Sequence, residues 1–435
     1  MNKSDLFTLI QEGDVKAIRL WFTDILGRVK GFSISLSEVE RALEEGINFD
    51  GSSIEGLVRI EESDLTAKPD LSSTYVFPDE NEKRTIIFIC DIYYPDGSPV
   101  GCSPRHILKK TLNKVKKKGW EFFVGSELEF FYFSEQRDLN IRDTKGYFDV
   151  LPYDKYDEIS EEIVNILNEV GVDVEVAHHE VSENQHEIDL RYEEALKMAD
   201  HIQVAKYVIK ETARKNGVFA TFMPKPVFGL NGSGLHLHQS FFKKGKNIFY
   251  DKKGSYNLSD IAQNYAAGLL KYSTEITSIT NQWVNSYKRL VPGYEAPVYV
   301  SWGRQNRSAL LRVPSFKGST SCRVEYRTPD PATNPYLSLS AMLGAGLMGV
   351  KNKLKLEDPI EEDIYTMSEE RKRKLNIEIL PDSLYTAIKA TEKSTMVKNL
   401  FGDEFFKKYI RNKKTEWENY SIQVTDYEIE KYLSL

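Results

Sequence analysis

Three short segments of this chain place ionisable side chains two residues apart within sequence that favours β-strands. They are Glu127-Leu-Glu129, His236-Leu-His238 and Arg323-Val-Glu325-Tyr-Arg327. Because residues i and i+2 of a strand share a face, each segment turns a polar face one way and an apolar face the other. For any one segment, the solvated face of an antiparallel sheet explains the pattern equally well. Three such segments within apolar or glycine-rich sequence predict strands that line a polar cavity.

Length and composition exclude several classes of protein. A chain of 435 residues can form two or three domains, and its formal charge of -7 opposes a generic nucleic-acid binder. The longest nearly apolar run, Leu337 to Val350, is too short to span a membrane, and the N-terminus has no secretory pattern, so we expect a cytoplasmic protein. The three cysteines lack CxxC spacing, which argues against a disulfide framework and a zinc site.

The first hundred residues predict a small α+β unit. We expect helices over 4–11 and from Ser37 to about Gly46, and strands over 17–24, 29–34 and 85–93. Turn residues cluster over 95–104, so the domain boundary is placed there, with domains over 1–102 and 103–435.

Strands and helices alternate in the remainder, which predicts an α/β catalytic domain. We expect strands over 120–133, 172–178, 234–242 and 321–328, and helices from Pro104 and over 156–169, 195–216 and 259–279. The tail from Pro381 is expected to be mostly helical.

Five carboxylates and one imidazole are candidate metal ligands: Glu127, Glu129, Glu180, Glu187, Glu325 and His236. Burying five carboxylates is very costly unless cations neutralise them, and two divalent ions would do so. Oxygen-rich ligands favour Mg²⁺ or Mn²⁺ over zinc. Two other interpretations stay open, because Glu180 and Glu187 could face water in an acidic loop and His236 could be a hydrogen-bonded core residue.

Six arginines fall within one short window: Arg289, Arg304, Arg307, Arg312, Arg323 and Arg327. The arginine fork binds carboxylates and phosphates, so arginines opposite two metal ions predict phosphoryl transfer. The sequence contains neither a Walker-type loop nor the protein-kinase signatures, so both of those classes are excluded.

Several motifs, in order along nearly the whole chain, resemble the type I glutamine synthetases. They are Phe49-Asp-Gly-Ser-Ser-Ile54, Gly125-Ser-Glu-Leu-Glu-Phe-Phe131, His178-His-Glu-Val181, Gln185-His-Glu187, Asn231-Gly-Ser-Gly-Leu-His236, Lys288 to Pro297, Asn306-Arg-Ser308 and Arg323-Val-Glu-Tyr-Arg327. The resemblance implies an α+β fold with an N-terminal β-grasp domain. A catalytic domain would follow, in which a curved antiparallel sheet forms a funnel-shaped site with helices outside.

The resemblance also implies the reaction and the assembly. ATP would phosphorylate the γ-carboxylate of L-glutamate, and ammonia would displace phosphate from γ-glutamyl phosphate to give L-glutamine for nitrogen assimilation. Two or more Mg²⁺ or Mn²⁺ ions would serve each site. A dodecamer of two stacked hexamers would place the active sites between adjacent subunits.

Residue roles follow from the same resemblance. One metal would be held by Glu129, Glu180 and Glu187, and the other by Glu127, His236 and Glu325. Glutamate would contact Asn231, Gly232, Arg289, Glu295, Arg307 and Arg327, and ATP would contact Glu175, His238, Ser240, Arg307, Arg312 and Arg323. Arg307 and Arg327 would stabilise the transferring phosphoryl group.

The resemblance also implies that two carboxylates bind and deprotonate the ammonia substrate. Asp50 and Glu295 would bind ammonium and accept its proton, with Asp50 reaching the site of a neighbouring subunit. Without the resemblance, Asp50 reads as an ordinary turn residue.

The chain departs from the family at two positions. Asn184 stands where the family commonly has glycine, and asparagine tolerates the left-handed backbone. Thr320 replaces a lysine that contacts ATP in some members, so that contact is in doubt.

Regulation is also suggested by the resemblance. The chain lacks the insertion that carries the adenylylated tyrosine of other members. The segment 56–63 resembles the alpha-like subgroup inhibited by glutamine, which makes Arg59 a candidate regulatory residue. Alternatively, Arg59 is a surface residue that pairs with Glu61 or Glu62. A regulatory protein or a metabolite effector is a further expected partner, and no motif selects among them.

Two other functions remain as alternatives. A related ligase would join glutamate to a polyamine or another amine, and a non-catalytic relative would act as a regulatory protein. Asp50 and Glu295 favour ammonia, and the six complete metal ligands favour catalysis.

Overall fold

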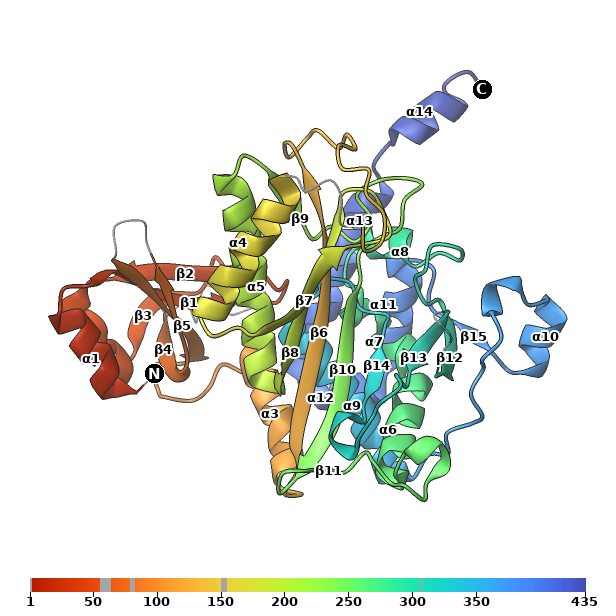
Figure 1. Cartoon of the computed structure of the whole chain (residues 1–435), viewed down its shortest axis with the longest axis horizontal. Helices are drawn as coiled ribbons and strands as arrows, with labels where there is room; N and C mark the ends of the chain where they lie inside the picture. The colour runs from red at the N-terminus through yellow and green to blue at the C-terminus, as the bar shows by residue number, and fades with distance from the viewer. Residues whose placement is uncertain (1, 55–63, 79–82, 150–154, 305, 307) are drawn as a thin grey trace.

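The computed structural model describes residues 2–54, 64–78, 83–149, 155–304, 306 and 308–435. It contains two β-sheets, and Figure 1 shows the smaller sheet with α1 at one end of the molecule. Among the described residues, no helix combines the length and apolar character that crossing a membrane requires.

In its described residues, the N-terminal unit is a five-stranded sheet with two α-helices. Its elements are α1 (Lys3–Gln11), β1 (Val15–Thr23), β2 (Val29–Ile34), α2 (Val39–Glu44), β3 (Ile47–Asp50), β4 (Asp64–Pro78) and β5 (Arg84–Tyr93). The strand order is β2-β1-β5-β4-β3, and β1 runs parallel to β5 while the other pairs are antiparallel. The expected β-grasp unit is confirmed, although β3 and β4 were not predicted. In β4, Pro69 and Pro78 obscure the strand pattern, and the register with β5 shifts between Pro69 and Thr74.

The larger unit is built on a second, curved sheet. Its strands are β6 (Glu121–Phe133), β7 (Val174–His179), β8 (Gln185–Glu194), β9 (Phe219–Thr221), β10 (Leu235–Lys243), β11 (Lys246–Asn247), β12 (Tyr299–Gly303), β13 (Ala309–Arg312), β14 (Val324–Tyr326) and β15 (Glu378–Ile379). The order is β15-β12-β13-β14-β10-β6-β8-β7, with β9 beside β6 and β11 beside β10. The described pairs are antiparallel except β12 with β13, so the sheet matches the family expectation rather than a parallel α/β sheet.

Helices cover this sheet and form the rest of the domain. They are α3 (Pro104–Lys116), α4 (Lys155–Glu169), α5 (Ala195–Lys215), α6 (Asp260–Lys271), α7 (Ser273–Thr280), α8 (Ser286–Arg289), α9 (Pro335–Asn352), α10 (Glu369–Lys374), α11 (Leu384–Lys393), α12 (Thr395–Phe401), α13 (Asp403–Ser421) and α14 (Asp426–Tyr432). Short 3₁₀ turns occur at Leu36–Glu38, Ser255–Asn257, Ser319–Ser321 and Ile364–Thr366.

One helix prediction in this domain was wrong, and one open alternative is decided. The single helix expected over 259–279 is two helices, because the backbone leaves the helical conformation at Tyr272 (φ -102°, ψ 7°). The alternative in which Glu187 faces water in an acidic loop does not hold, because Glu187 lies on β8 and is buried.

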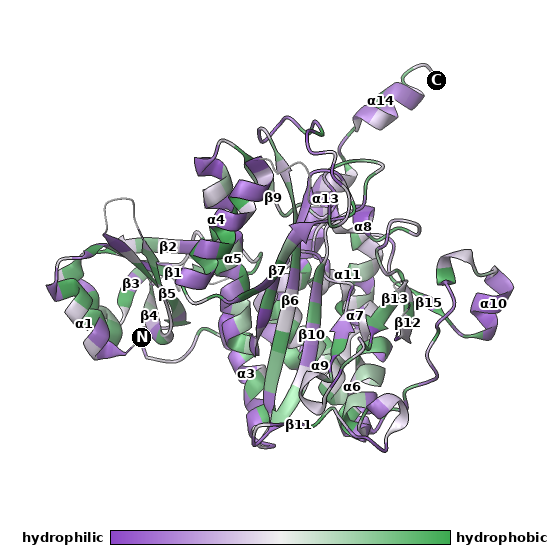
Figure 2. Ribbon diagram, in the orientation of Figure 1, coloured by the Kyte–Doolittle hydropathy of each residue, from purple (hydrophilic) through white to green (hydrophobic). Residues whose placement is uncertain are grey.

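The core lies between the sheet and the helices behind it. α9 is buried along most of its length. Gly268 lets α6 approach α9 closely, since a Cβ at that position would lie only 2.4 Å from the Ala345 carbonyl oxygen. Figure 2 shows polar residues predominating on α10 and α14, and α14 projects from the molecule in Figure 1. Because the helices cover one face of the large sheet, its other face can carry polar side chains.

A buried arginine joins the two units. Arg105 on α3 pairs with Asp70 and Asp91 of the smaller sheet and with Asp200 of α5, at 2.9, 2.7 and 2.9 Å. Because Arg105 is 2% exposed and its guanidinium contacts all three carboxylates, the orientation of the smaller sheet is tied to the catalytic domain.

Candidate active site

Strand register brings the predicted polar residues face to face across the large sheet. His236 on β10 lies opposite Glu127 on β6, and Glu129 lies opposite Glu187 on β8. On the other side of β10, His238 lies opposite Glu325 on β14, which in turn faces Arg312 on β13. Pairs that are distant in sequence thus converge because antiparallel neighbours share one face.

The residues between them point the other way. Leu128, Leu237, Val324 and Tyr326 are completely buried in the core. Glu127, Glu129, His236 and Arg327 line a cavity. The prediction that the alternating segments separate a core face from a polar cavity is confirmed for these residues.

Two adjoining cavities lie along this face. The first, about 250 Å³, is lined by the acidic residues together with Arg289 and Arg327, and by Asn231, Gly232 and Glu295. The second, about 320 Å³, is lined by Glu175, His238, Ser240, Thr320 and Arg323. Glu127 and Asp189 line both, so they mark the border between the two. Most of the predicted metal and glutamate residues thus line the first cavity, and most of the predicted ATP contacts line the second.

Glu127 accepts hydrogen bonds from two histidines. His238 Nε2 is 2.6 Å from one carboxylate oxygen, and His236 Nδ1 is 2.7 Å from the other. Arg323 Nε donates to His238 Nδ1 at 3.2 Å, so the proton of a neutral His238 sits on Nε2. Burial raises the pKa of Glu127, but the two imidazoles outweigh burial and hold the pKa well below its ordinary value.

Among the described residues, the acids beside β8 are less well compensated, although His178 lies 3.2 Å from Glu187. Glu129 accepts hydrogen bonds from the Gly234 amide (2.8 Å) and the Gln185 side chain (3.0 Å). Burial and the charge of Glu180 nevertheless raise the pKa of Glu129 to about 8. Burial and neighbouring carboxylates raise the pKa of Glu187 well above normal, and burial raises that of Glu180. This part of the cavity is therefore poorly compensated when all its acids are ionised.

The donor set fits divalent cations. At this site, three groups have ligand atoms within 4.8 Å of one another: Glu127 with His238 and Glu325, Glu127 with Glu187 and His236, and Glu180 with Glu187 and His178. Within the described ranges, the three groups contain five of the six predicted ligands, and Glu129 lies beside them, 3.6 Å from His236 Nε2. The raised pKa values of three of these acids are what a carboxylate cluster shows in the absence of its cation.

Arginines close the other side of the site. Arg327 Nη1 is 2.7 Å and Arg312 Nε is 2.5 Å from the two oxygens of Glu325, which is completely buried. Burial raises the pKa of Glu325, yet Arg327, His238 and Arg312 together lower it. Arg289 is anchored by the Thr328 and Arg327 carbonyl oxygens at 2.7 and 3.2 Å.

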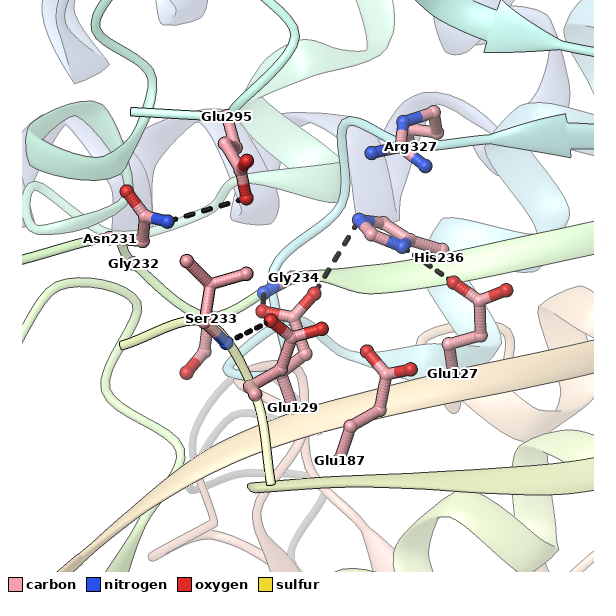
Figure 3. A network of polar contacts seen from close by, with 12 residues as sticks. Glu127, Glu129, Glu187, Asn231, Gly232, Ser233, Gly234, His236, Glu295 and Arg327 are labelled. Carbon is pink, nitrogen blue, oxygen red and sulfur yellow. Dashed lines mark hydrogen bonds and ion pairs between the residues drawn. The ribbon is translucent and has the colours of Figure 1, made fainter. Parts of the chain in front are cut away.

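The glycine-rich loop before β10 approaches the acids closely. A Cβ on Gly232 would lie 2.4 Å from the Pro224 carbonyl oxygen, and one on Gly234 would lie 2.7 Å from His236 Nε2. Asn231 Nδ2 donates to Glu295 at 3.3 Å, and Figure 3 shows this pair across the cavity from Glu187 and Glu127. Both glycines are thus required by the space available.

Several predicted residues do not converge here. Asp50 is exposed at the end of β3 and accepts a hydrogen bond from the Ser52 amide at 2.8 Å, away from both cavities of its own chain. Arg304 lies outside both cavities, with its guanidinium 5.8 Å from the Tyr256 ring. Arg59 and Arg307 fall outside the described residues.

Sequence reasoning missed two residues on the strands of the cluster. Asp189 follows Glu187 at i+2, which repeats the opening pattern a fourth time, and burial raises its pKa to about 6. His178 contacts Glu187 at 3.2 Å from β7. The Glu187-Ile-Asp189 spacing could have identified Asp189, whereas His178 depends on the β7–β8 register.

The two positions that differ from the family pattern, Asn184 and Thr320, both lie among the described residues. Asn184 adopts φ 61°, as its tolerance of the left-handed backbone predicted, and its side chain accepts hydrogen bonds from the Arg142 and Asp143 amides at 3.1 and 2.7 Å. Thr320 lines the second cavity.

The chain matches two family models. The model described as the beta-Grasp domain of glutamine synthetase matches residues 14–95, and the catalytic domain of glutamine synthetase matches residues 101–432. A glutamine synthetase from Clostridium saccharobutylicum is 44% identical over 99% of this chain and 98% of its own length, and one from Staphylococcus aureus gives the same values.

Solved structures show the same likeness. A complex of GmaS with ADP has a TM-score of 0.91 at 27% identity, covering 99% of this chain and 100% of that one. A cryo-electron microscopy structure of Plasmodium falciparum glutamine synthetase has a TM-score of 0.89 at 29% identity, covering 99% of both chains.

Proposed function

The chain belongs to the glutamine synthetase family, and we propose that its two adjoining cavities divide the reaction into an ATP side and a glutamate side. The enzyme uses ATP to join ammonia to glutamate and forms glutamine. The observation that carries the proposed division is the shared border at Glu127, between the acid-rich cavity and the cavity with His238 and Ser240.

The six predicted ligands would hold two divalent ions, Mg²⁺ or Mn²⁺. Glu127, Glu129, Glu180, Glu187 and His236 line one cavity, and Glu325 is buried beside them. Together they supply mostly oxygen donors, which suits these metals. Once bound, the ions would neutralise the acids and the charge of the phosphoryl group as it moves from ATP. His238 carries its proton on the nitrogen that faces Glu127, so His238 is better suited to the nucleotide side than to metal ligation.

Arginines and the glycine loop would orient glutamate. Arg289 is fixed by two backbone carbonyl oxygens and lines the first cavity, which prepares its guanidinium for a carboxylate. Asn231 and Gly232 line the same cavity and would contact the remaining polar groups of glutamate. Arg327, with Arg307, would stabilise charge on the transferring phosphoryl group and on γ-glutamyl phosphate.

The nucleotide would occupy the second cavity. Glu175, His238, Ser240 and Arg323 line this cavity, and Arg312 lines the first one beside Glu325. This arrangement would direct the terminal phosphate of ATP toward the border at Glu127 and the rest of the nucleotide away from glutamate.

Ammonia would be deprotonated by carboxylates at the mouth of the first cavity. Glu295 lines this cavity and is exposed, so it can receive the proton as the new C–N bond forms and phosphate leaves. Asp50 is remote from its own cavity, which supports a role in the site of an adjacent subunit. We therefore propose an oligomer, with the family dodecamer as its expected form, in the cytoplasm.

Regulation is a separate proposal. Arg59 would take part in feedback inhibition by glutamine, as in the subgroup that its segment resembles, and a regulatory protein or metabolite effector would act on the same assembly.

An amine panel tests the proposed substrate. Phosphate release with ATP, glutamate and Mg²⁺ should require ammonia and should be at least tenfold slower with ethanolamine, putrescine or spermine. Turnover with one of those amines that exceeds turnover with ammonia would instead identify a related glutamate–amine ligase. Absence of turnover with every amine would favour a non-catalytic relative.

A further inference from the structure

Asp143, His179 and His186 form a second polar cluster behind the proposed catalytic metals. His179 on β7 and His186 on β8 lie directly opposite each other in the register of the two strands. Their neighbours His178 and Glu187 form the adjacent pair, which faces the active site. Strand alternation therefore places His179 and His186 on the opposite face.

The three side chains converge on one carboxylate oxygen. Asp143 Oδ2 lies 3.2 Å from His179 Nε2 and 3.3 Å from His186 Nε2, and all three residues are buried. The other oxygen, Oδ1, accepts a hydrogen bond from the Lys145 amide at 3.1 Å. Oδ2 is thus the atom left to face the imidazoles.

The hydrogen bonding of His179 fixes its tautomer. His179 Nδ1 lies 2.6 Å from the Glu180 carbonyl oxygen, which can only accept, so Nδ1 carries the proton. A neutral His179 then directs the lone pair of Nε2 at a carboxylate oxygen. Neither His179 Nε2 nor Asp143 Oδ2 makes a hydrogen bond to any described residue. Two such atoms in buried contact require a cation between them. Burial lowers the pKa of His179 but Asp143 raises it more, so a proton can fill this place and a metal ion is the alternative.

We propose that Asp143, His179 and His186 bind a structural transition-metal ion of the Zn²⁺ type, separate from the catalytic metals. A tetrahedral ion with bonds of about 2.0–2.1 Å separates its ligand atoms by about 3.3 Å, which matches the two distances from Asp143 to the histidines. Two imidazoles favour such an ion over Mg²⁺. A backbone carbonyl that accepts the second N–H of a ligand histidine is the usual support. The cysteine pattern predicted no zinc site, and this set uses none of the cysteines.

An access route and a structural role both accompany the cluster. A cavity of about 500 Å³ is lined by His179 and His186 and by the acidic Asp149, Asp157 and Glu161. Such a lining attracts cations. The ion would fasten the segment that carries Asp143 to β7 and β8, directly beside the predicted ligands Glu180 and Glu187.

Cobalt provides a test that does not depend on turnover. Co²⁺ is titrated into the full-length protein in excess Mg²⁺, which occupies the carboxylate sites but competes poorly for imidazoles. We expect a single Co²⁺ per chain with the strong visible absorption of tetrahedral cobalt. Absence of that absorption in the unaltered protein would overturn the proposal and would indicate that a proton bridges the cluster. Neither outcome bears on glutamine synthesis.

Three variants locate the ion. Asp143→Asn preserves shape and hydrogen-bonding capacity and should weaken Co²⁺ binding at least about tenfold. His179→Gln should remove the tetrahedral absorption. His106→Gln, which alters a half-buried histidine on α3, is the matched control and should leave the absorption unchanged. Absorption that survives His179→Gln at full strength would place the cobalt elsewhere and refute the assignment.

Discussion

The carboxylates in and beside the first cavity form two halves that differ in how they are neutralised. Glu127 and Glu325 are surrounded by His236, His238, Arg312 and Arg327, and their pKa values are lowered. Burial and mutual repulsion raise the pKa values of Glu129, Glu180 and Glu187 by more than His178 and Arg289 lower them. One half is balanced by the protein's own cations, and the other requires cations from outside. The difference suggests that metal demand is concentrated beside β8.

The largest effect on turnover and stability is expected from removing Glu325, one of the two acids of the balanced half. Glu325→Ala leaves Arg327 and Arg312 without their buried partner and removes a predicted metal ligand. We expect turnover to fall by at least about a thousandfold, and stability to fall by about 3–5 kcal/mol. Steady-state phosphate release and denaturant unfolding measure the two effects.

A second substitution, at an exposed ion pair, serves as the control for Glu325→Ala. Lys355→Ala removes an exposed ion pair with Glu357 and should change neither quantity appreciably. If Glu325→Ala retains turnover within tenfold of the parent, Glu325 neither holds a catalytic metal nor positions the arginines.

The sequence predicted which residues lie in the two halves for the most part, but not how they pair. The i, i+2 spacing identified Glu127, Glu129, His236 and Glu325, because strand alternation is a local property. The strand over 121–133 was placed within one residue of its observed start.

Which carboxylate meets which cation depends on register, and register is a long-range property. Glu129 faces Glu187, and Glu127 faces His236, only because β6 lies between β8 and β10. The left-handed turn at Asn184 hid the start of β8, so Asp189 was overlooked. Asp143 was missed because its partners lie 36 and 43 positions further along the chain.

Removing metal should reveal the unbalanced half through pH. Burial and Glu180 raise the pKa of Glu129 to about 8, so the metal-free folded protein holds a proton that the unfolded chain releases near pH 4.5. Between these values the folded state binds more protons, and its stability should therefore fall as pH rises. The expected loss is on the order of 3 kcal/mol between pH 5 and 8, measured by denaturant unfolding after chelation.

Magnesium serves as the control for the pH series. Saturating Mg²⁺ should flatten the slope, because the bound ion replaces the proton. The balanced half has the opposite sign, since the depressed pKa of Glu127 contributes stability above about pH 4.5 that is lost as pH falls further. A metal-free protein whose stability rises from pH 5 to 8 would contradict the proposed imbalance.

The smallest and most discriminating effect compares matched substitutions in the two halves. Glu187→Gln replaces an acid whose ionised form is disfavoured by burial and by the neighbouring carboxylates, and should stabilise the chelator-treated protein at pH 8 by about 1–2 kcal/mol. Glu127→Gln removes the partner of two histidines and should destabilise that protein by about 1–3 kcal/mol. Both should abolish turnover if both residues hold metal. Denaturant unfolding without metal therefore separates them where activity cannot, and shifts of the same sign would show that the two halves are electrostatically alike.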